Sequence, residues 1–121
     1  MRALIFGTAL MLAGCQTVDT RGQAMALTPA QVTAIQDGVR TAMREPASAE
    51  FLGQPRAVRL TNGEVVVCGA VKGRNGFGGM TDWQPYIGGL QGERFVPSRV
   101  GGSVRDMEVT MMTCRSFGVH G

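Results

Sequence analysis

Apolar residues recur every three or four positions between residues 32 and 43, which is the spacing of one face of an α-helix. Just before this stripe, Thr28 and Gln31 fit a capping box, and Pro29 suits the first helical position. Pro46 disfavours helical angles in the residue before it, so a helix is predicted from Thr28 to about Arg44. The stripe is narrow, which indicates packing against a sheet, and consists of Val32, Ile35, Val39 and Met43.

The pattern changes to alternation after residue 55. Residues 56–61 place Val58 on an apolar face, and the pair Asn62-Gly63 that follows is typical of a two-residue type I′ hairpin. In that register, Val58 lies opposite Val67. Residues 64–71 are apolar on both faces, which predicts a central strand that is covered on both sides.

Two further strands are predicted over residues 86–90 and 94–99. Pro97 indicates that the second of these is an edge strand, because proline lacks the N–H group that a sheet interior requires. With the preceding hairpin, they give a sheet of three to four antiparallel strands.

The carboxyl-terminal segment 103–117 fits either a helix or a strand. Alternating apolar residues at 107, 109 and 111 fit a strand. Ser103 as a cap, Asp106 in the first turn and Gly118 as a stop favour a helix. The predicted fold class is therefore α+β, with an amino-terminal helix, a three- to four-stranded antiparallel sheet and a carboxyl-terminal helix, the alternative being a carboxyl-terminal strand.

The amino terminus has the features of an export signal. Arg2 provides a positive charge, and residues 3–13 form an apolar run too short to anchor stably across a bilayer. The sequence Leu12-Ala13-Gly14-Cys15 resembles the bacterial lipobox, in which a signal peptidase cuts before the cysteine. The alternatives are a plain signal peptide with a chance cysteine, or a buried apolar strand.

The lipobox resemblance implies three parts: a signal peptide over residues 1–14, a lipidated tether over 15–26 and a small α+β domain over 27–121. It implies that Cys15 becomes the acylated first residue, so that membrane lipid is the first partner. The expected location is the cell envelope, facing the periplasm. Gln16 occupies the position where aspartate retains lipoproteins of enteric bacteria in the inner membrane, so the outer membrane is favoured.

Two cysteines remain if Cys15 is acylated. Outside the cytoplasm, Cys68 and Cys114 are expected to form a disulfide. Closing a loop of about 46 residues stabilises a fold by roughly 4 kcal/mol in the chain-entropy model, which is large for so small a domain. The alternative is a reactive thiol or a metal site, and a metal site lacks ligands because His120 is the only histidine. No metal or other cofactor is expected.

Residues 73–86 form a glycine-rich loop with three aromatic residues. It lacks the Gly-Lys-Ser/Thr of a phosphate loop, so nucleotide binding is not expected. The favoured interpretation is a hairpin connection with Phe77 folded under it as a plug. The functional interpretation is a binding patch for a glycan or peptide. We call this set of residues the candidate patch: Arg74, Asn75, Phe77, Asp82, Trp83 and Tyr86.

The same region resembles small secreted bacterial proteins and lipoproteins of uncharacterised function. The shared features are a Val-Cys-Gly strand at 67–69, a Phe-Gly-Gly loop at 77–79 and Gln84-Pro85-Tyr86. The segment 46–51, with Pro46, Ser48, Ala49 and Phe51, is similar too. The sequence departs from the pattern at Lys72, where asparagine is expected, and at Met80, where tyrosine is expected. The resemblance implies a fold and no activity.

Composition narrows the function further. The net charge is +3 and the basic residues are scattered without a run, so no nucleic-acid partner is expected. A chain whose only histidine is the penultimate residue offers no evident general base, and we do not expect an enzyme. The leading hypothesis is a membrane-anchored envelope lipoprotein with a non-enzymatic binding or structural role, whose partner is the cell wall or another envelope protein. The alternative is an inhibitor or exclusion factor against an incoming protein such as a lysozyme.

Overall fold

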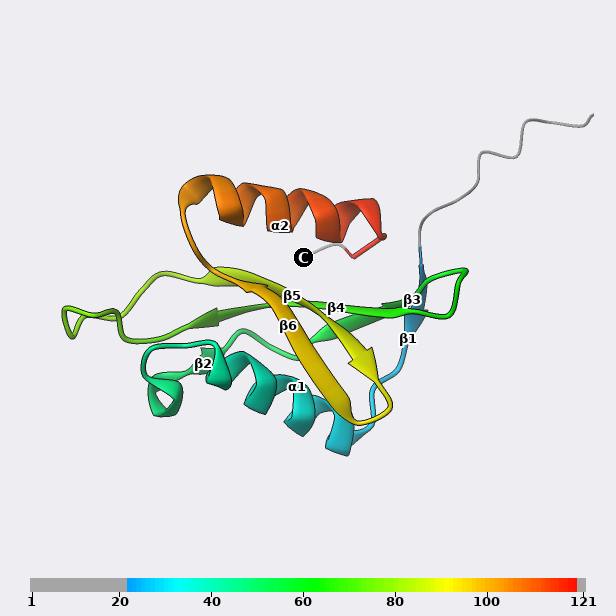
Figure 1. Cartoon of the computed structure of the whole chain (residues 1–121), viewed down its shortest axis with the longest axis horizontal. Coiled ribbons are helices and arrows are strands. Elements are labelled where there is room, and N and C mark those ends of the chain that lie inside the picture. The colour runs from blue at the N-terminus through cyan, green and yellow to red at the C-terminus, as the bar shows by residue number, and fades with distance from the viewer. Residues whose placement is uncertain (1–21, 120–121) are drawn as a thin grey trace, which may run out of the picture.

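The two longest strands lie side by side in a six-stranded antiparallel sheet in the computed structural model, which describes residues 22–119 (Figure 1). The strand order is β1-β3-β4-β5-β6. Strand β2 pairs with the end of β4, on the same edge of β4 as β3. Helices α1 and α2 lie on opposite faces of the sheet, as Figure 1 shows. The strands are β1 (Gln23–Met25), β2 (Glu50–Phe51), β3 (Arg56–Arg59), β4 (Val65–Lys72), β5 (Gln84–Gln91) and β6 (Arg94–Val100). The helices are α1 (Pro29–Thr41), the short 3₁₀ helix η1 (Pro46–Ser48) and α2 (Val104–Ser116).

The α+β class and the two helices are as predicted, but the prediction of three to four strands was wrong. The two additional strands contain only three and two residues, too few to show a period of two. Strand β1 lies within residues 15–26, which the sequence pattern assigned to the tether. It pairs with β3, so the sheet begins before residue 27.

Helix α1 begins as its capping pattern predicts. The Thr28 hydroxyl accepts a hydrogen bond from the Gln31 N–H at 3.1 Å, and the Gln31 side chain accepts one from the Thr28 N–H at 2.9 Å. Ile35 and Val39 are the fully buried residues of the helix. It ends at Thr41 instead of near Arg44, because the Ala42 N–H bonds to Val39 and Arg40 and tightens the last turn.

Strand β4 separates two apolar cores because successive side chains of a strand point to opposite faces. Val67 and Val71 face α1, in a core that also holds Tyr86, Leu90 and Phe95. Cys68 faces α2, in a smaller core with Val58, Ile87, Cys114 and Val119. The predicted coverage of this strand on both faces is therefore confirmed.

The predicted hairpin register was wrong by one residue. Val58 lies opposite Val66 instead of Val67. Beyond the strand ends, the Leu60 N–H donates to the Glu64 carbonyl at 2.8 Å, so the turn itself contains three residues, 61–63. Gly63 has a φ of 89°, as in three-residue hairpin turns that end in a left-handed residue. The shift moves Val58 to the α2 face, where it packs in the same core as Cys68.

Helix α2 confirms the favoured interpretation of the carboxyl-terminal segment. Ser103 and Asp106 form a reciprocal capping box, in which the Ser103 backbone N–H donates to the carboxylate and lowers the pKa of Asp106. At the other end, Gly118 has a φ of 89° and its N–H bonds to the Arg115 carbonyl at 2.9 Å. The Val119 N–H bonds to the Cys114 carbonyl at 2.9 Å, which completes a Schellman motif.

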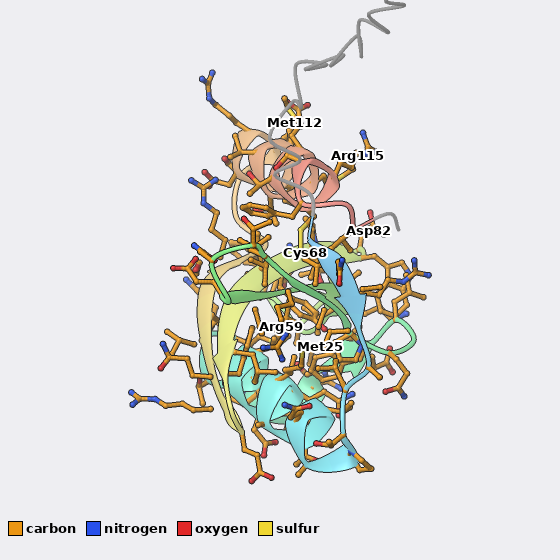
Figure 2. All side chains as sticks on the ribbon, turned by 90° about the vertical axis from the view of Figure 1, so that its right-hand side faces the viewer. Met25, Arg59, Cys68, Asp82, Met112 and Arg115 are labelled. Atoms are coloured by element: carbon orange, nitrogen blue, oxygen red, sulfur yellow. A yellow bond between two sulfur atoms is a disulfide. The ribbon has the colours of Figure 1, made fainter. Side chains whose placement is uncertain are left out.

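The predicted disulfide is present between Cys68 in β4 and Cys114 in α2. The sulfur atoms are 2.12 Å apart and the Cα atoms 6.3 Å apart. Figure 2 shows Cys68 on the sheet beneath α2. The bond joins the centre of the sheet to the last turn of the helix that covers its smaller core.

Tyr86 and Gly69 form a close contact in the larger core. The two residues are direct partners across β4 and β5, and the tyrosine ring occupies the space that a side chain at 69 would need. The ring of Phe51 meets that of Tyr86 edge to face, with centroids 6.3 Å apart. A glycine at 69 is therefore required for this packing.

We expect the substitution Gly69→Ala to lower the free energy of unfolding by about 1–3 kcal/mol, because the new methyl group collides with the buried ring. Urea unfolding followed by circular dichroism measures the change. Gly89→Ala is the matched control: it lies in β5, and the nearest atom to its added carbon is the Val65 carbonyl oxygen at 4.0 Å. Equal losses in the two variants would contradict the assigned contact.

Candidate binding surface at the β4–β5 loop

Residues 73–83 connect β4 and β5 and contain most of the candidate patch. The base of this loop is closed by hydrogen bonds across it. The Thr81 N–H donates to the Gly73 carbonyl at 2.7 Å, and the Gly73 N–H donates to the Thr81 hydroxyl at 3.1 Å. Arg74 and Met80 form an antiparallel bridge one step further out. The loop therefore continues the hairpin beyond the two strands.

Asn75 organises the tip of the loop. Its side-chain oxygen accepts hydrogen bonds from the N–H groups of Phe77 at 2.9 Å and Gly79 at 3.2 Å. Its backbone N–H donates to the Gly79 carbonyl at 2.8 Å, and Gly78 adopts a φ of 81°. The Asn75 carboxamide oxygen is thus engaged within the loop, which gives this residue a structural role.

The segment that follows α1 supports the loop from one side. The Ser48 hydroxyl accepts a hydrogen bond from the Arg74 N–H at 2.9 Å and donates one to the Glu45 carbonyl at 2.7 Å. The Arg44 guanidinium also lies next to Gly76. The tip is therefore held both by its own hydrogen bonds and by neighbouring elements.

Phe77 is fully exposed, with 100% of its surface accessible. The expectation that it folds under the loop as a plug was wrong. The hydrogen bonds of Asn75 close the turn through the backbone of residue 79, and the side chain of Phe77 points into solvent. No periodicity exists in so short a loop, so the sequence could not indicate this direction.

Tyr86 lies apart from the rest of the candidate patch. Only 1% of its surface is accessible, and it belongs to the core beneath α1. Burial raises the pKa of its hydroxyl to about 12. Tyr86 is therefore a packing residue, and the exposed members of the candidate patch are Arg74, Asn75, Phe77, Asp82 and Trp83.

Trp83 lies at the end of the loop and is 42% exposed. The Lys72 ammonium group lies over its ring, 4.7 Å from the centroid, and also forms an ion pair of 3.3 Å with Glu50. Met80, three residues before Trp83, is also exposed. Lys72 and Met80 are the two positions at which the sequence departs from the secreted-protein pattern; Lys72 contacts Trp83, and Met80 is exposed in the loop.

The described residues offer no metal site. Within residues 22–119, no group of three or more His, Cys, Asp or Glu side chains is placed to hold an ion. The same part of the chain contains no helix with the length and apolar character that crossing a bilayer requires. Cys15, the signal segment 1–14 and His120 lie outside the described residues.

Comparison of the chain with models of protein families, with curated proteins and with solved structures gave no match.

Removal of the Asn75 side chain by Asn75→Ala is expected to release the Phe77 and Gly79 amides, because both lose their acceptor. Hydrogen exchange at these two amides should accelerate about tenfold, while global stability changes by less than about 1 kcal/mol. Asn62→Ala is the control, since the Asn62 side chain accepts a hydrogen bond from the Glu64 N–H in the β3–β4 loop. Unchanged exchange at residue 77 in Asn75→Ala would show that other bonds hold the tip.

Alkaline pH is expected to destabilise the protein through Tyr86. The pKa of this hydroxyl is about 12 in the folded protein and 10.0 in a model tyrosine. The resulting contribution to stability is complete below pH 10 and is lost as the pH rises through 12, by about 2–3 kcal/mol. Tyr86 is the sole tyrosine, so phenolate absorbance reports it alone. The variant Tyr86→Phe should lose this part of the alkaline decline, and an unchanged decline would contradict the assignment.

Proposed function

We propose that this protein is a membrane-anchored envelope lipoprotein with a non-enzymatic role, which binds another envelope component through the tip of the β4–β5 loop. Two features support export. The lipobox at residues 12–15 implies acylation of Cys15, and a disulfide between Cys68 and Cys114 persists in oxidising surroundings. Residues 1–14 then act as the signal peptide and Cys15 contacts membrane lipid, with the outer membrane favoured.

The exposed side chain of Phe77 is the observation that carries the binding proposal. Leaving a phenylalanine in water forgoes roughly 2 kcal/mol of burial free energy. A loop that is held rigid around such a side chain loses little conformational entropy when a partner covers it. Aromatic anchors of this kind dominate the binding energy of protein interfaces.

The position of the loop fits an anchored protein. Figure 1 shows the tip of the β4–β5 loop at one end of the molecule and β1, where the described chain begins, at the other. The chain from Cys15 to Gly22 spans at most roughly 25 Å when extended. A protein held by Cys15 can therefore present Phe77 at the end remote from its anchor, toward the cell wall or another envelope protein.

The second candidate function is an inhibitor or exclusion factor against an incoming protein such as a lysozyme. A projecting loop with a fully exposed aromatic residue, Phe77, at its tip suits insertion into an enzyme cleft. Without residues 1–14, which include Arg2, eleven basic and nine acidic residues remain, and this net charge of +2 disfavours basic enzymes as targets because like charges repel across an interface. This candidate therefore ranks below binding of a resident envelope component.

Crosslinking in the native membrane, followed by purification of the tagged chain, tests the proposal. We expect Phe77→Ala to reduce the captured partner about tenfold, which corresponds to about 1.4 kcal/mol. Val96→Ala, at an exposed position of β6, should capture as much as the wild type. Full capture by Phe77→Ala would remove the loop from the function, and recovery of an added lysozyme would favour the inhibitor.

A further inference from the structure

Helix α2 carries exposed apolar side chains on the side turned away from the sheet. Thr110 and Cys114 are its buried residues, and at about 100° per residue Met112 lies on the opposite side of the helix from both. Figure 2 shows Met112 on the side of α2 away from the sheet. We call this side the outer face of α2; its exposed apolar residues are Val104, Val109, Met111 and Met112.

Helix α1 has no comparable surface. Within residues 22–119, nine large apolar residues are exposed; four of them lie on α2 and none on α1. Beyond its first turn, the exposed residues of α1 are Thr33, Asp37 and Thr41. The two helix-covered faces of the molecule therefore differ, with a polar surface over α1 and apolar groups over α2.

The charged groups on the outer face of α2 make it weakly basic. Arg105, Glu108 and Arg115 are exposed there, so two arginines and one glutamate give a net charge of +1. Asp106 is held in the capping box and lies near Arg99, and counting this pair leaves the sum unchanged. Such a face suits a neutral or anionic bilayer, because long arginine side chains reach the headgroups while apolar groups sit lower.

The described chain begins beside the carboxyl-terminal end of α2. The Gly22 N–H donates to the carbonyl of Phe117, the residue that follows the helix, at 2.9 Å. A side chain at Gly22 would meet Val58, which belongs to the core on the α2 side of the sheet. Figure 1 shows the start of β1 and this end of α2 on the same side of the molecule.

This position places α2 close to the proposed lipid anchor. If Cys15 is acylated, the chain from Cys15 to Gly22 keeps the end of α2 within roughly 25 Å of the bilayer. A short linker of this kind gives an effective concentration on the order of millimolar. A few apolar side chains bind a bilayer only weakly, but next to an anchor a weak affinity is enough to keep the face in contact.

We propose that the outer face of α2 is the membrane-contacting surface of this protein, which lies on the bilayer that holds Cys15. The inference rests on the proposed function, because it requires the acylated anchor, and it narrows the partner. Figure 1 shows α2 lying along the long axis of the molecule, with the tip of the β4–β5 loop at one end. With α2 on the bilayer, this loop extends along the membrane surface, which favours a neighbouring protein of the same membrane over the cell wall.

Methionine oxidation tests the contact with native side chains. Met111 on α2 and Met80 in the β4–β5 loop have nearly equal exposed fractions, 44% and 46%. The acylated chain, purified from its native host, is placed in vesicles of phosphatidylcholine and phosphatidylglycerol at about 3:1 and treated with chloramine-T. This water-soluble oxidant converts exposed methionine to the sulfoxide, and peptide mass spectrometry gives the rate at each methionine.

We expect Met111 and Met112 to be oxidised at least about fivefold more slowly than Met80, because lipid headgroups cover them. Without such cover, Met111 would match Met80, and Met112, which is 66% exposed, would exceed both. Val104→Glu adds a carboxylate to the outer face and should raise the rate at Met112 at least about threefold. Thr33→Glu, at an exposed position of α1 on the other face of the sheet, should change neither rate.

Several results with Cys15 acylated would overturn this inference and leave the proposed function intact. Equal rates at Met111 and Met80, or protection that Val104→Glu leaves unchanged, would show that α2 does not lie on the bilayer. Protection in native envelopes but not in vesicles would assign the face to a partner protein, and protection lost when the protein is diluted in the bilayer would assign it to a second copy. Absence of acyl mass on Cys15 in the same spectra would instead overturn the proposed function, and this inference with it.

Discussion

The disulfide between Cys68 and Cys114 is the constraint on which one half of this fold depends. The core beneath α2 contains few large side chains, and the two half-cystines are among its five buried members. In the chain-entropy model, a loop of 46 residues contributes about 4 kcal/mol, comparable to the whole stability of many small domains. The bond fixes the end of α2 over the sheet. Secondary structure on the α1 face relies instead on a larger core.

Buried packing residues and the exposed loop tip lie close together in the chain. Tyr86 and Gly69 pack in the core, whereas Phe77, nine residues before Tyr86, is fully exposed. Asn75 and Ser48 connect the two regions, since they hold the exposed tip by hydrogen bonds without contributing to a core.

Local chemistry made both helices predictable. The capping boxes at Thr28 and Ser103 and the stop at Gly118 act within a few residues, so their signals are complete in the sequence. The hairpin register was not predictable in the same way, because Asn62-Gly63 fits both a two-residue loop and the three-residue loop that forms. Packing settles that choice by placing Val58 with Cys68. The directions of Phe77 and Tyr86 likewise depend on tertiary contacts, as does the pairing of the short strands β1 and β2.

We propose that this domain folds in an oxidising compartment, held by one disulfide and anchored by one acylated cysteine. Intact mass spectrometry of the protein from its native host, alkylated without prior reduction, is the decisive experiment. We expect a chain that begins at Cys15, carries fatty-acyl mass and takes up no alkylating reagent. A chain that retains Met1, lacks acyl mass and is alkylated at both Cys68 and Cys114 would contradict it.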